Sequence, residues 1–175
     1  NVSGSRIKCW KHGGHGSQTF LQVVENSCNP GFVIMGEKLG KEKLMDYIKK
    51  FGFGEKTGID LSGEENGILF DIDKMGPVET ATTAFGPGVS VTPIQQVMGV
   101  SAAINGGNLY TPYLVSSISN ANTLDTVLVN KPKLKRNIIS EESSKMVRYA
   151  LESVVAKGTG RNAYLNGYRV GGKTG

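Results

Sequence analysis

Glycine limits the length of every helix and strand that this chain can form. The sequence of 175 residues contains 24 glycines, and many of them gather in short groups between apolar stretches. Because glycine weakens the interior of helices and strands and permits tight turns, each group marks a boundary. The main groups lie at residues 13–16, 86–88, 106–107 and 171–172. We therefore expect short elements joined by many turns, as in an enzyme rich in loops, and no low-complexity region.

The composition indicates an ordinary globular chain with a single core. Hydrophobic residues make up 38% of the sequence and charged residues 20%, and the length suits one core better than two. No apolar run is long enough to span a membrane and no signal peptide is evident, so we expect any membrane anchor to lie outside this chain. The net charge is +5, but the basic residues are scattered, apart from Lys131, Lys133, Lys135 and Arg136. We expect that cluster to be a solvated loop and expect no nucleic-acid partner.

Five segments have the apolar spacing and the end signals of helices. Ser17, Thr92 and Ser140 suit helix N-caps, and Pro30 and Pro93 suit the first helical turn. The expected helices run from the Ser17 cap to Asn26, from Pro30 to the stop at Gly40, from Lys41 to Phe51, from Pro93 to Ile104, and onward from the Ser140 cap. The expected core face of the last helix comprises Met146, Val147, Ala150, Leu151, Val154 and Val155.

The remaining segments are predicted to be loops and strands. Residues 52–75 are expected to be mostly loop, and residues 109–118 and 126–130 have the composition of strands. Residues 167–175 are expected to form a turn that enters a strand. We expect the aromatic side chains of Trp10 and Phe20 to pack in the core or against loops.

Two tripeptides, Ser27-Cys28-Asn29 and Lys173-Thr174-Gly175, carry the strongest functional signal. Ser-x-Asn and Lys-Thr-Gly, in this order, are two of the three signatures of penicillin-recognising serine enzymes. The third signature is Ser-x-x-Lys, which supplies the nucleophile. Residues 5–8 have that spacing, but they lack the apolar helix that would place the lysine one turn from the serine. We therefore expect the nucleophile to precede residue 1.

Each residue of the two tripeptides suits a step of acyl transfer. Lys173 would attract a substrate carboxylate and Thr174 would hydrogen-bond to it, while Gly175 would let the substrate backbone approach closely. The Ser27 hydroxyl can relay a proton toward the leaving amine, and the Asn29 amide can hold a substrate carbonyl. The alternative is that Ser27 and Asn29 only cap a helix and that Lys173 faces solvent.

A second Lys-Thr-Gly lies at residues 56–58. It sits in a glycine-rich loop and has no strand-like segment before it. A substrate-binding Lys-Thr-Gly should lie on a strand beside the nucleophile, so we assign that role to residues 173–175.

Longer segments around these tripeptides resemble class B penicillin-binding proteins, most closely the division and sporulation type of Gram-positive spore formers. Residues 9–30, with Cys-Trp, Gly-His-Gly and Glu-Asn-Ser-Cys-Asn-Pro, are similar to the Ser-x-Asn region of that family. Residues 51–64, 84–95 and 158–175 are similar to its later segments, in the same order. Pro87 stands where the family more often has glutamine or another residue. The resemblance covers nearly the whole chain and is more specific than either tripeptide.

The resemblance implies an α+β fold of the penicillin-binding transpeptidase and serine β-lactamase type, with a helical lobe packed on an antiparallel sheet that is incomplete here. Residues 1–175 would be part of one transpeptidase domain, on the extracytoplasmic face of the cell membrane. The implied activity is that of a peptidoglycan D,D-transpeptidase. A serine is acylated by the penultimate D-Ala of a stem peptide, the terminal D-Ala leaves, and the acyl group passes to an amine of a second stem.

The same resemblance implies the ligands and the rival functions. β-Lactams would acylate the same serine, the chemistry needs no cofactor, and other cell-wall synthesis proteins are possible partners. A D-Ala-D-Ala carboxypeptidase and a penicillin-sensing receptor domain share these motifs and are alternatives. A non-catalytic, zinc-stabilised binding module is an alternative of another class, and it would lack Ser-x-x-Lys upstream.

Cysteine and histidine form a second constellation near the N-terminus. Cys9, His12 and His15 lie within one glycine-rich loop, and Cys28 offers a fourth ligand for a structural zinc ion. Both cysteines and both histidines of the chain fall within these residues. A Cys9–Cys28 disulfide and free thiols beside loop histidines are the alternatives, and spacing alone leaves all three open.

Overall fold

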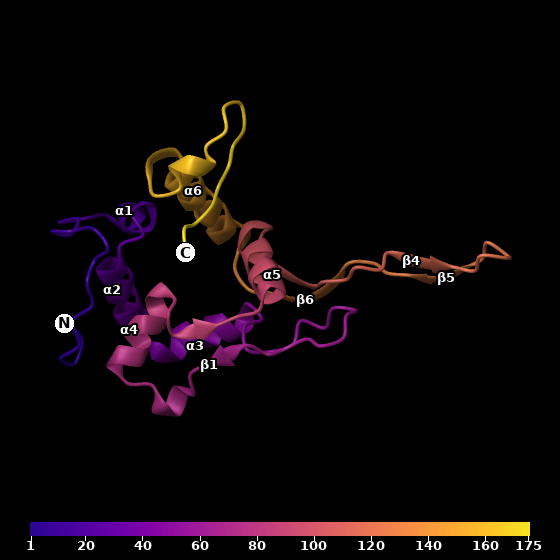
Figure 1. The fold of residues 1–175 in the computed structure, drawn as a ribbon, viewed down its shortest axis with the longest axis horizontal. Coiled ribbons are helices and arrows are strands. Elements are labelled where there is room, and N and C mark those ends of the chain that lie inside the picture. Colours follow the sequence, from indigo (N-terminus) through magenta and orange to yellow (C-terminus); the bar gives the residue numbers. More distant parts are fainter.

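The computed structural model describes residues 1–175, and a long hairpin projects from a body made mainly of helices (Figure 1). The chain forms six α-helices and two short 3₁₀ helices. They are α1 (Phe20–Glu25), α2 (Asn29–Leu39), α3 (Lys41–Lys50), α4 (Pro77–Phe85), α5 (Pro93–Ile104) and α6 (Glu141–Lys157), with η1 (Ile72–Lys74) and η2 (Arg161–Ala163). The helices predicted from the sequence are all present.

The strands are short and form three separate two-stranded sheets. They are β1 (Ile68–Leu69), β2 (Val89–Ser90), β3 (Asn108–Thr111), β4 (Ser117–Ser119), β5 (Thr126–Val129) and β6 (Lys133–Asn137). The pairs β1–β2, β3–β6 and β4–β5 are all antiparallel. Helices combined with antiparallel strands confirm the expected α+β class.

Side-chain caps explain where the helices begin. The Thr19 hydroxyl accepts a hydrogen bond from the Gln22 amide, and the Gln22 side chain accepts one from the Thr19 N–H at 2.8 Å. This capping box starts α1 after Thr19, so the predicted cap at Ser17 is wrong. Thr92 caps α5 in the same way and Ser140 caps α6, as predicted.

Helix α4 is absent from the sequence-based prediction. Pro77 stands in its first turn, and the Glu79 carboxylate accepts a hydrogen bond from the Gly76 N–H at 2.9 Å. These are ordinary helix-start signals, but the interior is rich in alanine and threonine. Such an interior lacks the large apolar side chains that mark an amphipathic helix, which is why the periodicity gave no signal.

The basic cluster at residues 131–136 is largely exposed, as predicted, but it is not a loop, because Lys133–Asn137 form strand β6 beside β3. Lys135 donates to the carbonyl oxygen of Thr57 at 3.3 Å, and Arg136 donates to that of Lys50 at 2.8 Å. These cations satisfy backbone acceptors of a neighbouring segment. These backbone partners lie far away in the sequence, so the spacing of residues along the chain could not reveal them.

Buried apolar residues form two small clusters. One contains Val2, Val33 and Ala81, and the other contains Met98, Ala102 and Leu109. Val154 and Val155 are buried on α6, as predicted, whereas Met146, also expected on the core face, is 61% exposed. Trp10 and Phe20 are 60% and 71% exposed, so neither packs in the core, but Trp10 packs edge-on against His15 of the N-terminal loop, which fits the expected loop packing. None of the helices combines the length and the apolar character needed to cross a bilayer.

The C-terminal segment differs from its prediction as well. Residues 169–175 form no strand, although the Gly172 N–H donates to the carbonyl oxygen of Leu151 at 3.1 Å. A strand is defined by a hydrogen-bonded neighbour, and no strand of the described chain lies alongside this segment. The segment instead runs back along α6 toward the centre of the body (Figure 1).

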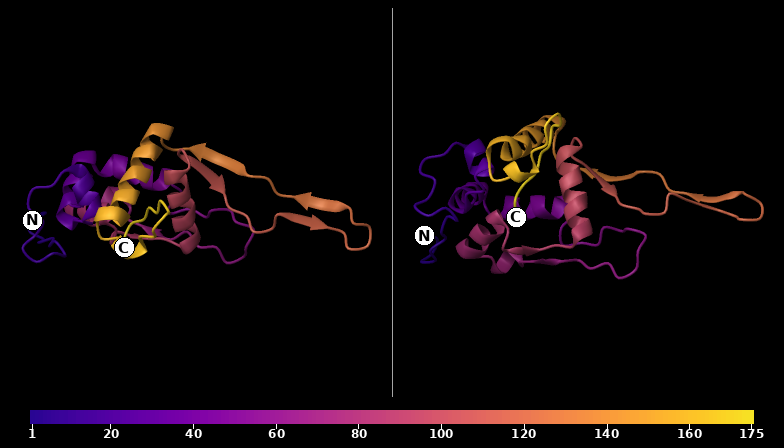
Figure 2. Two further views of the ribbon diagram at one scale, coloured as in Figure 1. Left: turned by 90° about the horizontal axis from the view of Figure 1, so that it is seen from above. Right: turned by 45° about the horizontal axis from the view of Figure 1, so that its top comes forward.

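The β4–β5 hairpin extends away from the helices (Figure 2). Its base is tied to the loop after α3, because the Asp60 carboxylate accepts hydrogen bonds from the N–H groups of Leu114 and Val115 at 2.7 and 2.9 Å. The hairpin therefore lies outside the region that contains both functional tripeptides.

Candidate active site

A single pocket of about 810 Å³ contains both tripeptides. Ser27 and Asn29 line it from the α1–α2 junction, and Lys173, Thr174 and Gly175 line it from the end of the chain. These residues are far apart in sequence, so the fold and not local spacing brings them together. The structure thus places every residue of the predicted catalytic and substrate-binding sets in one cavity.

Ser27 occupies a strained position that ends helix α1. Its N–H donates to the Val24 carbonyl at 3.2 Å, and the Cys28 N–H donates to the Val23 carbonyl at 3.1 Å. These two bonds form a Schellman motif, in which the residue at the position of Ser27 is usually glycine. Ser27 has a φ of 49°, in the left-handed region that costs a residue with a side chain about 1–2 kcal/mol. Such local backbone strain is common at functional sites.

Asn29 is the first residue of α2, directly before Pro30. Its side-chain amide donates to the carbonyl oxygen of Lys8 at 3.4 Å, a long hydrogen bond. Neither Ser27 nor Asn29 supplies a cap bond to α2, whose N-cap residue is Cys28. The structure therefore contains no side-chain hydrogen bond by which Ser27 or Asn29 would cap α2.

Lys173 connects the two tripeptides directly. Its ammonium nitrogen lies 2.5 Å from the Ser27 hydroxyl oxygen, although the residues are 146 positions apart, and 2.8 Å from the Thr174 carbonyl oxygen. It also lies 5.8 Å from the centre of the Phe32 ring. Lys173 is exposed as a whole, but its charged end is partly shielded in the pocket, and this desolvation lowers the pKa of its ammonium group.

Thr174 is held by a residue outside either tripeptide. The hydroxyl oxygens of Thr159 and Thr174 lie 2.8 Å apart, and Thr159 also lines the pocket. Thr174 and Gly175 are exposed, and the Thr174 hydroxyl has no hydrogen-bond partner besides Thr159, so it remains accessible to a ligand.

Several residues of the pocket wall escaped the sequence analysis. Trp10 lines the pocket and donates its indole N–H to the Asn26 carbonyl at 2.9 Å. Thr83 also contributes to the wall, and its buried hydroxyl has no hydrogen-bond partner. The remaining wall residues that were not singled out are Phe32, Ala84, Phe85, Gly86 and Thr159. Exposed aromatic and small residues give no local signal, so only the fold reveals them.

Neither of the competing motifs contributes to this pocket. Residues 5–8 are not helical, and Ser5 instead pairs with Val2 in an isolated β-bridge. Thr57, in the second Lys-Thr-Gly, is fully buried and gives both its N–H and its hydroxyl to the Glu64 carboxylate. The structure thus agrees with the rejection of both motifs.

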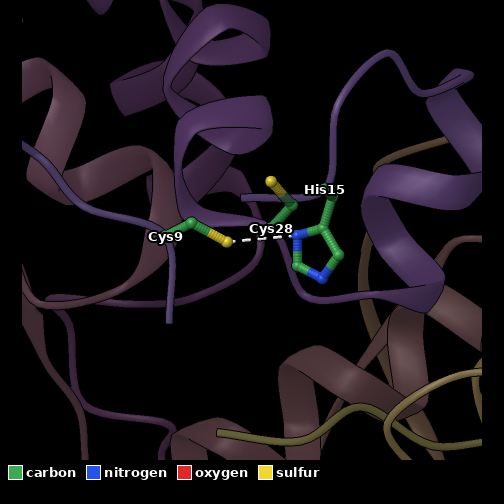
Figure 3. Close-up of side chains that lie close together, drawn as sticks. All are labelled: Cys9, His15 and Cys28. Atoms are coloured by element: carbon green, nitrogen blue, oxygen red, sulfur yellow. Dashed lines mark hydrogen bonds between the residues drawn. The ribbon is translucent and has the colours of Figure 1, made fainter. Parts of the chain in front are cut away.

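Three of the four predicted metal ligands lie together. The ligand atoms of Cys9, His15 and Cys28 all lie within 4.8 Å of one another, and the Cys9 sulfur is 3.1 Å from the His15 Nδ1 (Figure 3). Both cysteines are free, so the disulfide is not formed. His12 lies outside this cluster, because the tight turn closed by the bond from the Gly14 N–H to the Lys11 carbonyl leaves it exposed.

This arrangement brings together several groups of the kind that acyl transfer uses, without a nucleophile or a general base for it. A cation lies beside a serine hydroxyl that can accept and donate a proton, and an exposed threonine and glycine follow on the same segment. An anionic group of a ligand would meet Lys173 and Thr174, and a scissile amide would lie near Ser27 and Asn29.

Comparison with known proteins agrees with this geometry. The family described as penicillin binding protein transpeptidase domain matches residues 1–175. Stage V sporulation protein D of Bacillus subtilis is 67% identical over 174 residues, which cover 99% of this chain and 27% of that protein. The chain thus spans about a quarter of the length of the curated relatives that it matches.

Solved structures of related proteins have the same fold, with TM-scores of 0.89 and 0.82 in the two following examples. The D,D-transpeptidase domain of a peptidoglycan glycosyltransferase from Eggerthella lenta superposes with a TM-score of 0.89 at 27% identity, over 100% of this chain and 45% of that one. Penicillin-binding protein 3 of Mycobacterium tuberculosis in complex with ampicillin has a TM-score of 0.82 at 28% identity, over 89% of this chain and 35% of that one. The transpeptidase-type fold expected from the sequence is confirmed.

Proposed function

Because this chain belongs to the penicillin binding protein transpeptidase domain family, we propose that it forms part of a serine-type peptidoglycan D,D-transpeptidase. One observation carries this proposal above all: the Lys173 ammonium lies 2.5 Å from the Ser27 hydroxyl inside a pocket that both tripeptides line. Residues 1–175 are one part of the transpeptidase domain, and the nucleophilic serine comes from a Ser-x-x-Lys segment outside this chain.

Each pocket residue has a role in that reaction. Lys173 and Thr174 bind the terminal carboxylate of the D-Ala-D-Ala stem peptide, and Gly175 lets its backbone approach. Asn29 holds the carbonyl group of the acyl-donor peptide. Ser27 relays a proton toward the leaving D-Ala, and the positive charge of Lys173 lowers the pKa of the general-base lysine in the missing segment.

The same site accepts β-lactams, which resemble the acyl donor and carry a carboxylate. The fold similarity to a penicillin-binding protein solved with ampicillin supports this ligand class. The enzyme acts on the extracytoplasmic face of the membrane, where stem peptides are located, and an anchor lies outside this chain. The 67% identity to a stage V sporulation protein supports a role in wall synthesis during sporulation.

Labelling of the complete domain with a fluorescent penicillin tests the proposal. We expect one covalent adduct on the serine of an upstream Ser-x-x-Lys, identified by peptide mass spectrometry. We also expect D-Ala release from a stem pentapeptide to yield a cross-linked product when an amine acceptor is present. Absence of any adduct would contradict the proposal, and hydrolysis with no transfer to the amine would favour a carboxypeptidase.

A structural zinc ion at Cys9, His15 and Cys28 is a separate part of the proposal. Two sulfurs and an imidazole nitrogen within 4.8 Å of one another fit the donor preference of zinc, which needs one more ligand to complete a tetrahedron. The ion would tie the 9–16 loop to the N-cap residue of α2, and would thereby support Ser27 and Asn29. His12 is not a ligand in this arrangement.

Elemental analysis of the purified domain after dialysis tests the zinc site. We expect one zinc per chain, lost in Cys9→Ser together with thermal stability, and retained in His12→Ala as the matched control. A metal-free protein of full stability would contradict the proposal. A mass two hydrogens below that of the reduced chain would instead identify a Cys9–Cys28 disulfide.

A further inference from the structure

The turn Gly158-Thr159-Gly160, which follows α6, contacts the segments of both tripeptides. The Thr159 N–H donates to the carbonyl oxygen of Glu25 at 2.9 Å, two residues before Ser27. The Thr159 hydroxyl lies 2.8 Å from the Thr174 hydroxyl. One threonine therefore connects the segment that carries Ser27 with the segment that carries Lys173.

The approach between this turn and Glu25 is too close for any side chain at position 158. A Cβ atom on Gly158 would lie 2.8 Å from the carbonyl carbon and 2.9 Å from the Cα of Glu25, closer than real Cβ contacts. The Ser153 hydroxyl, one turn earlier on α6, donates to the Glu25 carboxylate. The backbone of Thr159 is thus fixed on the site wall independently of its own hydroxyl.

The hydrogen-bond distances favour one direction for the Thr159 hydroxyl proton, although either hydroxyl of the Thr159–Thr174 pair can donate. The hydroxyl has two neighbours, the Thr174 oxygen at 2.8 Å and the Glu25 carbonyl oxygen at 3.4 Å. The Glu25 carbonyl already accepts the Thr159 N–H, so the shorter contact to Thr174 is the better use of the proton. If Thr159 donates to Thr174, then the proton of Thr174 stays free to point into the pocket.

We propose, building on the function proposed above, that Thr159 is a positioning residue for recognition of the substrate carboxylate. Its hydroxyl donates to Thr174 and orients Thr174 as a donor to the carboxylate that Lys173 attracts. Two hydroxyls in series polarise each other, so the bond to the carboxylate is stronger than Thr174 alone would make it. Thr159 itself does not contact the reacting atoms.

The test compares Thr159→Val with Thr159→Ser in the complete domain. Valine keeps the shape and the backbone N–H and removes only the hydroxyl, and serine keeps the hydroxyl. The measured quantity is the second-order acylation rate with benzylpenicillin, which has a free carboxylate, and with its methyl ester, which does not. Loss of one net hydrogen bond predicts a fall of about threefold to tenfold for the free acid in Thr159→Val. We expect little change for the ester, wild-type behaviour in Thr159→Ser, and no effect of Thr126→Val, a matched change on the distant hairpin.

An equal fall for the acid and the ester would overturn the inference, because it would assign Thr159 a general structural role. No fall for either would overturn it as well. Failure of the wild-type domain to react at all would contradict the proposed function and not this inference. In that case, a double-mutant cycle on thermal unfolding tests the contact between Thr159 and Thr174. Thr159→Val and Thr174→Val should be non-additive, and additive losses would show that the two hydroxyls are not coupled.

Discussion

The chain contains the tripeptide Lys-Thr-Gly twice, and the two copies have opposite surroundings. At residues 56–58, Thr57 is fully buried, and the Glu64 carboxylate accepts its N–H at 2.6 Å and the Gly58 N–H at 3.0 Å. At residues 173–175, the segment is exposed in the pocket, and Lys173 contacts Ser27 at 2.5 Å. In the first copy, Thr57 gives both of its donors to a carboxylate of the same loop, whereas in the second copy the Thr174 hydroxyl is exposed in the pocket and contacts only the Thr159 hydroxyl.

The comparison teaches that the tripeptide Lys-Thr-Gly does not by itself make a functional site. The loop copy stabilises a turn, because one carboxylate satisfies buried donors that would otherwise be unpaired. The terminal copy becomes part of a site because the fold places it against the α1–α2 junction. The following changes should separate the two roles, with loss of acylation at one copy and loss of stability at the other.

Ser27→Ala should have the largest effect. Removal of a positioned proton relay lowers the rate by about 10²–10⁴, so acylation of the complete domain by penicillin should fall by that factor. Thermal stability should barely change, because the Schellman bonds at residue 27 are made by the backbone. Ser62→Ala, in the loop near the first copy, is the matched control and should acylate normally. Asn29→Ala should slow acylation less.

Lys173→Ala should come next, with Lys56→Ala as its control. Loss of a charged contact that touches the ligand costs about 2–5 kcal/mol, which corresponds to roughly 30-fold to several-thousand-fold slower labelling. Lys56 does not line the pocket, so its removal should leave labelling unchanged. Similar losses in both variants would mean that Lys173 acts only through the overall charge of the chain.

Glu64→Gln should have the opposite effect to the substitutions in the pocket: it should lower the stability of the domain and leave penicillin labelling normal. Desolvation raises the pKa of Glu64, but the hydrogen bonds from Thr57 and Gly58 outweigh it and leave the pKa below its ordinary value. A carboxyl group whose pKa is lowered by folding stabilises the protein above its unfolded pKa, and this contribution is lost as the pH falls through the folded pKa. The variant should lose about 1–2 kcal/mol at neutral pH, with a flatter acid limb in chemical denaturation. A wild-type acid limb in Glu64→Gln would contradict the role of this carboxylate.

The smallest expected effect is the difference in stability between Ser27→Gly and Ser27→Ala. Glycine removes the left-handed strain at residue 27, although it also adds entropy to the unfolded chain. Ser27→Gly should therefore be more stable than Ser27→Ala by about 0.5–1 kcal/mol in thermal denaturation, while both lose acylation. Equal stability of the two variants would indicate that residue 27 is not strained.

The sequence predicted the elements whose signals are local. Caps at Thr92 and Ser140, and the stop at Gly40, involve neighbours in sequence, so these helix ends lie where the pattern indicates. Strand β6 pairs with β3, and helix α4 packs through Ala81 against Val2 and Val33. These partners are distant in sequence, so hydrophobic periodicity does not reveal them. The C-terminal segment lacks its strand for the same reason, since a strand exists only with a neighbour.

The residues of the site show the same difference between local signals and long-range contacts. Residues 27, 29 and 173–175 belong to short motifs with recognisable chemistry, and the fold gathers them in one pocket. Thr159 and Trp10 contribute through long-range contacts to Thr174 and Asn26, which no spacing in the sequence encodes. His12 fits the metal-ligand spacing but faces outward, because a turn of glycines sets its direction.

A double-mutant cycle on acylation tests most directly whether the two tripeptides act as one site. Ser27→Ala, Lys173→Ala and the double variant are compared in the rate of penicillin labelling of the complete domain, with Lys56→Ala in place of Lys173→Ala as the reference cycle. Residues that act as a unit are strongly non-additive, so the first double variant should be about as slow as the slower single variant, and the reference cycle should be additive. If the rate of the Ser27–Lys173 double variant falls by the product of the two single losses, the two residues are additive in free energy. That result would contradict the account, because it would show that the contact between them has no part in the reaction.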